Sequence, residues 1–144
     1  MSNIKVAVTI RALQTLDGEK ETMTQRAQGT LRREGETWLL TYREGEASGL
    51  GDTQTSLEVG PAQAVLTRTG EVVSRMVFRP GQSQTSFYQT PYGRLPMTLR
   101  TLALRSDLSP EGGHIAIHYQ IQLGGGSAGE TRLRLTVQAK ENEP

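Results

Sequence analysis

Cysteine is missing from the 144 residues of this chain, so disulfides, thiolate metal sites and a cysteine nucleophile are all excluded. Aromatic residues make up only 5%, which leaves few of the stacking platforms on which single-stranded nucleic acid binds. The formal net charge of +1 gives no long-range field that would attract nucleic acid or an acidic membrane. We therefore expect neither nucleic acid nor a membrane among the partners.

Long apolar runs are missing as well. No stretch approaches the roughly 20 apolar residues of a membrane-spanning helix. Polar residues interrupt the N-terminal segment, which therefore lacks the continuous apolar core of a signal peptide, and we expect a cytoplasmic location. The length predicts a single domain over residues 1–144, with a polar C-terminal tail from about residue 140.

Apolar residues recur at every second position, which is the period of a half-buried strand. The clearest example is the stretch 115–123, where Ile115, Ile117, Tyr119, Ile121 and Leu123 share one phase. Turn signals separate such stretches at short intervals, among them Asp17-Gly18, Glu34-Gly35, Gly60-Pro61, Pro80-Gly81 and Pro91-Tyr92-Gly93. The pattern predicts an all-β domain, a single antiparallel meander of about ten strands that closes into a barrel.

Two positions predict irregularities in this barrel. Gly29 interrupts a strand pattern and indicates a bend or a bulge. In the stretch 94–106, Leu95, Met97 and Leu99 lie in one phase whereas Leu102 and Leu104 lie in the other. A β-bulge near Thr101 would reconcile the two phases.

A set of short motifs resembles the YwiB-like bacterial proteins. The motifs are Tyr42-x-Glu44, Arg68-x-Gly70, Met76-Val-Phe78 and Tyr88-x-Thr90-Pro91-x-Gly93, and the similarity covers nearly the whole chain in order. These proteins are small calycin-like β-barrels of unassigned function. The resemblance implies a lipocalin-like barrel in a bacterial cytoplasm, and it supplies no catalytic residues.

One polar constellation is the candidate binding site: Arg68, Glu44, Tyr42, Tyr88 and Thr90. Glu44 is in phase with apolar residues of its strand, and so is Arg68, so that both charges point inward near strand ends. One reading is a barrel mouth in which the arginine grips an anionic ligand and the tyrosines provide walls and donors. The other is a structural ion pair that closes one barrel end, or strand ends that lie in solvent.

The remaining motifs predict no chemistry. His114 and His118 lie four residues apart on a strand, roughly 13 Å, which is too far to share a metal ion. The run Gly124 to Gly129 satisfies G-x-G-x-x-G, but a strand pattern follows where dinucleotide binding requires a helix. The arginines 75, 79, 132 and 134 lack interleaved aromatics for nucleic acid. We expect no metal, no cofactor and no catalytic residues.

The function expected from these observations is binding rather than catalysis. The barrel would hold a small, partly apolar molecule with an acidic group near Arg68. The alternative is a solid barrel whose surface, the Tyr88–Gly93 turn and the 45–51 loop, docks a protein partner or a second copy. The chain would then be a monomer or a homodimer.

Overall fold

The computed structural model describes residues 3–44, 50–126 and 128–140. Within these ranges ten strands follow one another: β1 (Ile4–Leu16), β2 (Glu19–Glu34), β3 (Thr37–Arg43), β4 (Thr53–Val59), β5 (Ala64–Gly70), β6 (Val73–Phe78), β7 (Ser83–Thr90), β8 (Gly93–Ser106), β9 (Gly112–Leu123) and β10 (Gly129–Ala139). Each strand pairs antiparallel with the next, and β1 also pairs with β10. The predicted fold, an all-β antiparallel meander closed into a barrel, is confirmed.

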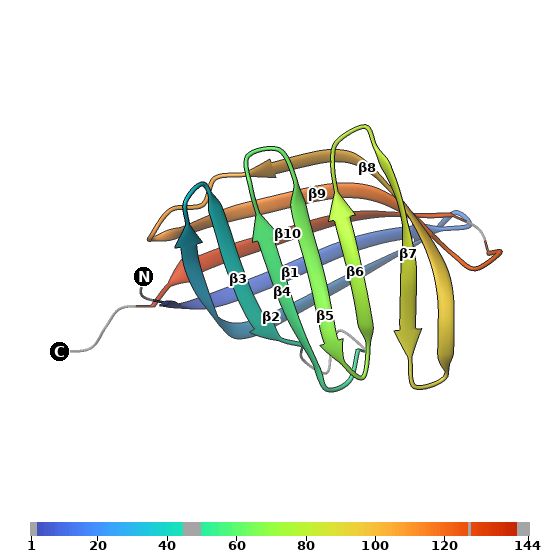
Figure 1. The fold of residues 1–144 in the computed structure, drawn as a ribbon, viewed down its shortest axis with the longest axis horizontal. Helices are drawn as coiled ribbons and strands as arrows, with labels where there is room; N and C mark the ends of the chain where they lie inside the picture. Colours follow the sequence, from blue (N-terminus) through green and yellow to red (C-terminus); the bar gives the residue numbers. More distant parts are fainter. Residues whose placement is uncertain (1–2, 45–49, 127, 141–144) are drawn as a thin grey trace.

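Two groups of strands cross each other in this barrel (Figure 1). Strands β3 to β7 form the layer nearest the viewer, and β1, β9 and β10 run behind it at a steep angle. The two longest strands, β2 with 16 residues and β8 with 14, curve from one layer to the other. Among the described residues no helix could span a membrane.

The period-two pattern explains which side chains fill the barrel. On β9, Ile115 and Ile117 point inward and are buried, whereas His114, in the opposite phase, is exposed. Burying each such side chain contributes roughly 1.5–3 kcal/mol. The buried core takes inward residues from all strands except β7, whose half-buried Tyr88 packs against it. Its fully buried members include Val6, Leu31, Leu40, Leu57, Leu66, Phe78, Met97, Leu99, Ile115 and Leu135.

The turn between β1 and β2 has the backbone that its sequence requires. Asp17 has a φ of 52° and Gly18 a φ of 81°. Two central residues with positive φ make a type I′ turn, which matches the right-handed twist of the flanking strands. The Asp-Gly pair therefore fixes the register of the hairpin at one end of the barrel.

The predicted bulge on β8 is confirmed, since the pairing with β9 shifts register between Thr101 and Ala103. On β2 the pairing runs through Gly29 without a shift, so the bulge considered there is not formed. Gly29 instead allows a close approach, because a Cβ at this position would lie 2.4 Å from the carbonyl oxygen of Thr41. Curvature of β2 thus depends on a missing side chain rather than on an extra residue.

The contact between β6 and β7 is the shortest ladder of the barrel. Only Val73 and Ser74 pair across it, with Gln89 and Tyr88 respectively. Since every other ladder has at least five paired residues, β7 is held mainly by β8. The two pairs that do form set the position of Tyr88 relative to β6.

Candidate functional site

Five inward-facing residues with polar groups lie in one row across β3 to β7. The strand registers place them opposite one another in the order Tyr42, Thr55, Arg68, Ser74 and Tyr88. Because neighbouring strands lie about 4.8 Å apart, the five side chains form a continuous row on the inner wall. We call this row the polar belt.

Glu44 follows β3 and places its carboxylate beside the polar belt. Its side chain is only 2% exposed. One carboxylate oxygen accepts a hydrogen bond from Gln25 Nε2 at 2.7 Å, and the other accepts one from the Thr55 hydroxyl. Tyr42 also hydrogen-bonds to this carboxylate. Neutral donors therefore satisfy the buried negative charge.

Arg68 is the positive charge of the site, and its donors are largely unused. Its Nε lies 3.9 Å from Glu44 Oε2, which is close enough for an ion pair but too long for a hydrogen bond. Its Nη1 reaches only the sulfur of Met76, also at 3.9 Å. The buried Nε has no hydrogen-bond partner among the described residues. A guanidinium offers five N–H donors, so most of them remain for another group.

The next residue of the polar belt after Arg68 is also unsatisfied. The Ser74 hydroxyl oxygen is buried without a hydrogen-bond partner in the described part of the chain. Tyr88, the next residue along, is half-buried, and its hydroxyl makes no hydrogen bond to any described residue. Buried polar groups are normally hydrogen-bonded, so the buried Arg68 Nε and the Ser74 hydroxyl on neighbouring strands call for an explanation.

A cavity of about 480 Å³ opens onto this part of the belt. It lies at the barrel end where the β1–β2 and β9–β10 turns come together, on the right in Figure 1. Its wall contains Tyr42, Glu44, Arg68 and Tyr88. The rest is mostly apolar and comes chiefly from β1, β2, β9 and β10, namely Ile10, Ala12, Met23, Tyr119, Ile121, Leu123 and Leu133. The cavity therefore joins a mostly apolar chamber to one cationic side chain, Arg68, and its wall also includes the acids Asp17 and Glu130.

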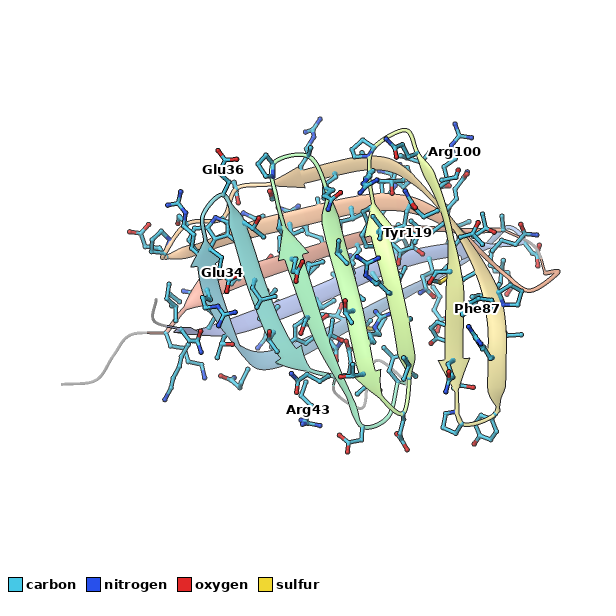
Figure 2. All side chains as sticks on the ribbon, viewed as in Figure 1. Glu34, Glu36, Arg43, Phe87, Arg100 and Tyr119 are labelled. Atoms are coloured by element: carbon cyan, nitrogen blue, oxygen red, sulfur yellow. The ribbon has the colours of Figure 1, made fainter. Side chains whose placement is uncertain are left out.

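Burial keeps the tyrosines of this wall neutral. It raises the pKa of Tyr42, and the negative charge of Glu44 raises it further. Burial also raises the pKa of Tyr119, which is labelled in Figure 2. Its hydroxyl hydrogen-bonds to Thr131, and its ring packs against that of Phe78 at a centroid distance of 5.0 Å. Both hydroxyls are therefore hydrogen-bonding groups at neutral pH and not anions.

The structure brings four of the five predicted site residues to one cavity wall: Tyr42, Glu44, Arg68 and Tyr88. Thr90 is not part of it. Its hydroxyl accepts a hydrogen bond from Tyr92 N and donates one to the Gly93 carbonyl, so it serves the β7–β8 turn.

Sequence reasoning missed Gln25 in the cavity wall, and Thr55 and Ser74 in the polar belt beside it. Gln25 shares the inward phase of Met23, which is the signal that could have found it. Thr55 and Ser74 were visible as polar residues in apolar phases, but only the register shows that they flank Arg68 on either side.

Neither histidine lines the cavity, although Glu130, the partner of His118, does. The Nδ1 of His114 is 3.5 Å from Asp107 Oδ2, and His118 pairs with Glu130. No group of three potential metal ligands occurs among the residues that the structure describes. The glycine run Gly124 to Gly129 leads into the strand β10, as predicted, and not into a helix. Residues 45–49 of the predicted docking loop lie outside the described residues.

The fold and the cavity define a class: a small, closed, ten-stranded β-barrel with one polar spot inside. The chain belongs to the family described as "Domain of unknown function (DUF1934)", which matches residues 8–135. It is 28% identical over 109 residues to the uncharacterized beta-barrel protein YwiB of Bacillus subtilis (strain 168), covering 75% of each chain. The predicted resemblance to YwiB-like proteins is thereby confirmed.

A solved structure supports the fold independently. The crystal structure of the ywiB protein from Bacillus subtilis matches with a TM-score of 0.87, at 23% identity, over 96% of this chain and 94% of that one. At this level of identity the match shows that the two chains share a fold.

Proposed function

We propose that the barrel binds a small, partly apolar molecule and holds its anionic group at Arg68. The observation that carries the proposal is the unused guanidinium of Arg68 at the cavity wall, which it shares with the Tyr88 hydroxyl, a group without a hydrogen bond in the described residues. Glu44 already accepts hydrogen bonds from Gln25 and Thr55, so it does not use these donors. A carboxylate or similar anion would accept hydrogen bonds from the Arg68 Nη groups and from the Tyr88 hydroxyl.

The shape of the cavity fits the remainder of such a ligand. Its volume of about 480 Å³ is in the range of small-molecule sites. Apolar side chains such as Ile10, Ile121 and Leu133 cover its wall away from Arg68. Each buried methylene would contribute about 0.8 kcal/mol, and the charged hydrogen bonds at Arg68 about 1.5–3 kcal/mol.

A matched pair of probes separates the contribution of the apolar wall from that of Arg68. Dodecanoate and dodecanol have the same chain and differ in the anionic group. In calorimetric titrations the wild type should bind dodecanoate at least about tenfold more tightly than dodecanol, because one charge-assisted hydrogen bond is worth that ratio. In Arg68→Met the preference should vanish while dodecanol binding remains.

The control variant is Arg75→Met, which removes the same charge from the outer face of β6. It should bind both probes as the wild type does. Equal affinity of the wild type for the two probes, or an unchanged preference in Arg68→Met, would contradict the proposal.

A second candidate function, docking of a protein partner or a second copy, is favoured by the β7–β8 hairpin. Tyr92 at its tip is 98% exposed, and Phe87 and Leu95 are each nearly half exposed. If the hairpin docks another copy, native mass spectrometry should show a dimer that Tyr92→Ser weakens. A monomer at every accessible concentration would remove self-association from consideration.

A further inference from the structure

Six arginines gather on the outer face of β1, β2, β8 and β10. They are Arg11, Arg26, Arg100, Arg105, Arg132 and Arg134, and all six are exposed. We call this surface the arginine wall. Figure 2 shows one of them, Arg100, pointing away from the barrel.

The strand registers bring these side chains close together. Arg11 lies directly opposite Arg134, and Ala116 separates Arg134 from Arg105. Directly opposed residues have Cβ atoms about 5 Å apart, and two strand spacings amount to about 9.5 Å. Arg132 adds a fourth guanidinium two residues along β10. Arg11 and Arg105 are three strand spacings apart, so four positive charges share a surface about 14 Å across.

None of the six arginines has an ion pair or a hydrogen bond within residues 3–44, 50–126 and 128–140. Of the acids on these strands, Glu34 pairs with Arg32 and Glu130 with His118. Glu19 and Glu21 are exposed beside the β1–β2 turn, opposite Leu16 and Gln14, and form no ion pair with the six arginines. Like charges directly opposite on paired strands are destabilising, so the pair Arg11 and Arg134 costs stability without a compensating contact inside the chain. Such a cost points to an external partner of opposite charge.

We propose that the arginine wall binds the phosphate backbone of double-stranded nucleic acid. Arginine presents a planar fork that matches phosphate, and the wall carries six of them and no lysine near its centre. The described outward residues of these strands include no aromatic side chain, so there is no platform for the bases of a single strand and no aromatic anchor of the kind that dominates protein interfaces. Leu102 on β8 is exposed between Arg100 and Arg105 and is flanked by charge on both sides.

This proposal departs from the expectation drawn from the net charge, and segregation of charge is the reason. The chain carries 15 acids, but those on the described hairpins lie largely at strand ends, whereas the six arginines lie along strands. A net charge of +1 thus hides a cationic face that only the strand registers assemble.

The test is fluorescence anisotropy with short DNA and RNA duplexes of one arbitrary sequence, titrated between about 50 and 200 mM salt. We expect micromolar binding at the low end. Each phosphate contact contributes about −0.9 to the slope of log K against log salt, so six contacts predict a slope of about −5. Arg11→Gln combined with Arg134→Gln should make the slope less steep by about 2.

The control is Arg75→Gln combined with Arg79→Gln, which removes the same net charge from the far side of the barrel and should leave the slope unchanged. Arg68→Met, inside the cavity, should also bind duplex as the wild type does. No duplex binding at low salt, or an equal loss in the wall and control variants, would overturn the proposal. Binding of poly-glutamate or of phosphatidylglycerol vesicles in place of duplex would overturn it too.

Discussion

Replacement of Arg68 by methionine should leave the barrel almost as stable as the wild type, whereas replacement of Glu44 by alanine should not. The two residues form an ion pair, and a purely structural pair would suffer in a similar way from either change. The proposed site is asymmetric instead. Glu44 holds Gln25 and Thr55, but Arg68 makes no hydrogen bond to oxygen or nitrogen in the described residues.

The magnitudes follow from these contacts. At 3.9 Å the attraction between the charges is about 4 kcal/mol at an effective dielectric constant of about 20. Removing Arg68 loses this attraction but also relieves the desolvation of the guanidinium, several kcal/mol by the same kind of estimate. The two contributions oppose each other, so we expect Arg68→Met within about 1.5 kcal/mol of the wild type.

Glu44→Ala has no such compensation. It removes two hydrogen bonds to a charged group, each worth about 1.5–3 kcal/mol, and leaves Arg68 as a partly buried cation without a counter-charge. The expected loss is about 3–5 kcal/mol, or a fall of roughly 2 M in the urea midpoint. Urea unfolding of both variants measures the difference. If Arg68→Met loses as much stability as Glu44→Ala, Arg68 is a structural residue and the binding argument is refuted.

Three further predictions concern the same wall and its scaffold. Burial raises the pKa of Tyr42, so above about pH 10 the folded chain keeps a proton that the unfolded chain loses. The contribution of Tyr42 to the free energy of unfolding should therefore be constant below about pH 10 and fall above it by up to about 1.4 kcal/mol per pH unit. Urea unfolding across this range should show a shallower fall for Tyr42→Phe, and an identical profile would contradict the cause. Ser74→Ala removes a hydroxyl that has no hydrogen-bond partner among the described residues, so in urea unfolding it should change stability by less than about 1 kcal/mol; a loss above about 2 kcal/mol would show a structural role. Gly29→Ala should lower stability by about 1–3 kcal/mol in thermal unfolding, because its Cβ would meet the Thr41 carbonyl at 2.4 Å, and an unchanged melting temperature would be inconsistent with that contact.

Much of the fold could be predicted because successive side chains of a strand point to opposite faces of the sheet, a period of two residues that does not depend on tertiary context. That rule places Arg68 and Glu44 on inward faces once Leu66 and Leu40 are assigned to the core, and both assignments hold. It also required a bulge near Thr101, since no straight strand could bury Met97 and Leu104 together.

The composition of the site was less predictable, because phase within one strand says nothing about register between strands. Whether Ser74 or a neighbour would lie opposite Arg68 depends on turn geometry and packing. Thr90 shows a second limit. It has the inward phase of Tyr88, but the hydroxyl of a residue beside a turn can hydrogen-bond to local backbone groups, as that of Thr90 does.

The arginine wall illustrates the same limit on the outer face. Arg11 and Arg134 are more than a hundred residues apart in sequence, and their opposition appears only when β1 closes the barrel on β10. Composition reports the sum of charges, whereas binding depends on where the folded chain places them.

The measurement that tests the central claim most directly is native mass spectrometry of freshly purified protein, before and after addition of dodecanoate, compared with the denatured mass. The account predicts one bound molecule per wild-type barrel, which is lost on denaturation and whose occupancy in Arg68→Met falls to the level seen with dodecanol. A wild-type barrel that binds nothing, or an Arg68→Met variant that binds equally, would contradict a cavity whose purpose is to hold an anionic ligand at Arg68.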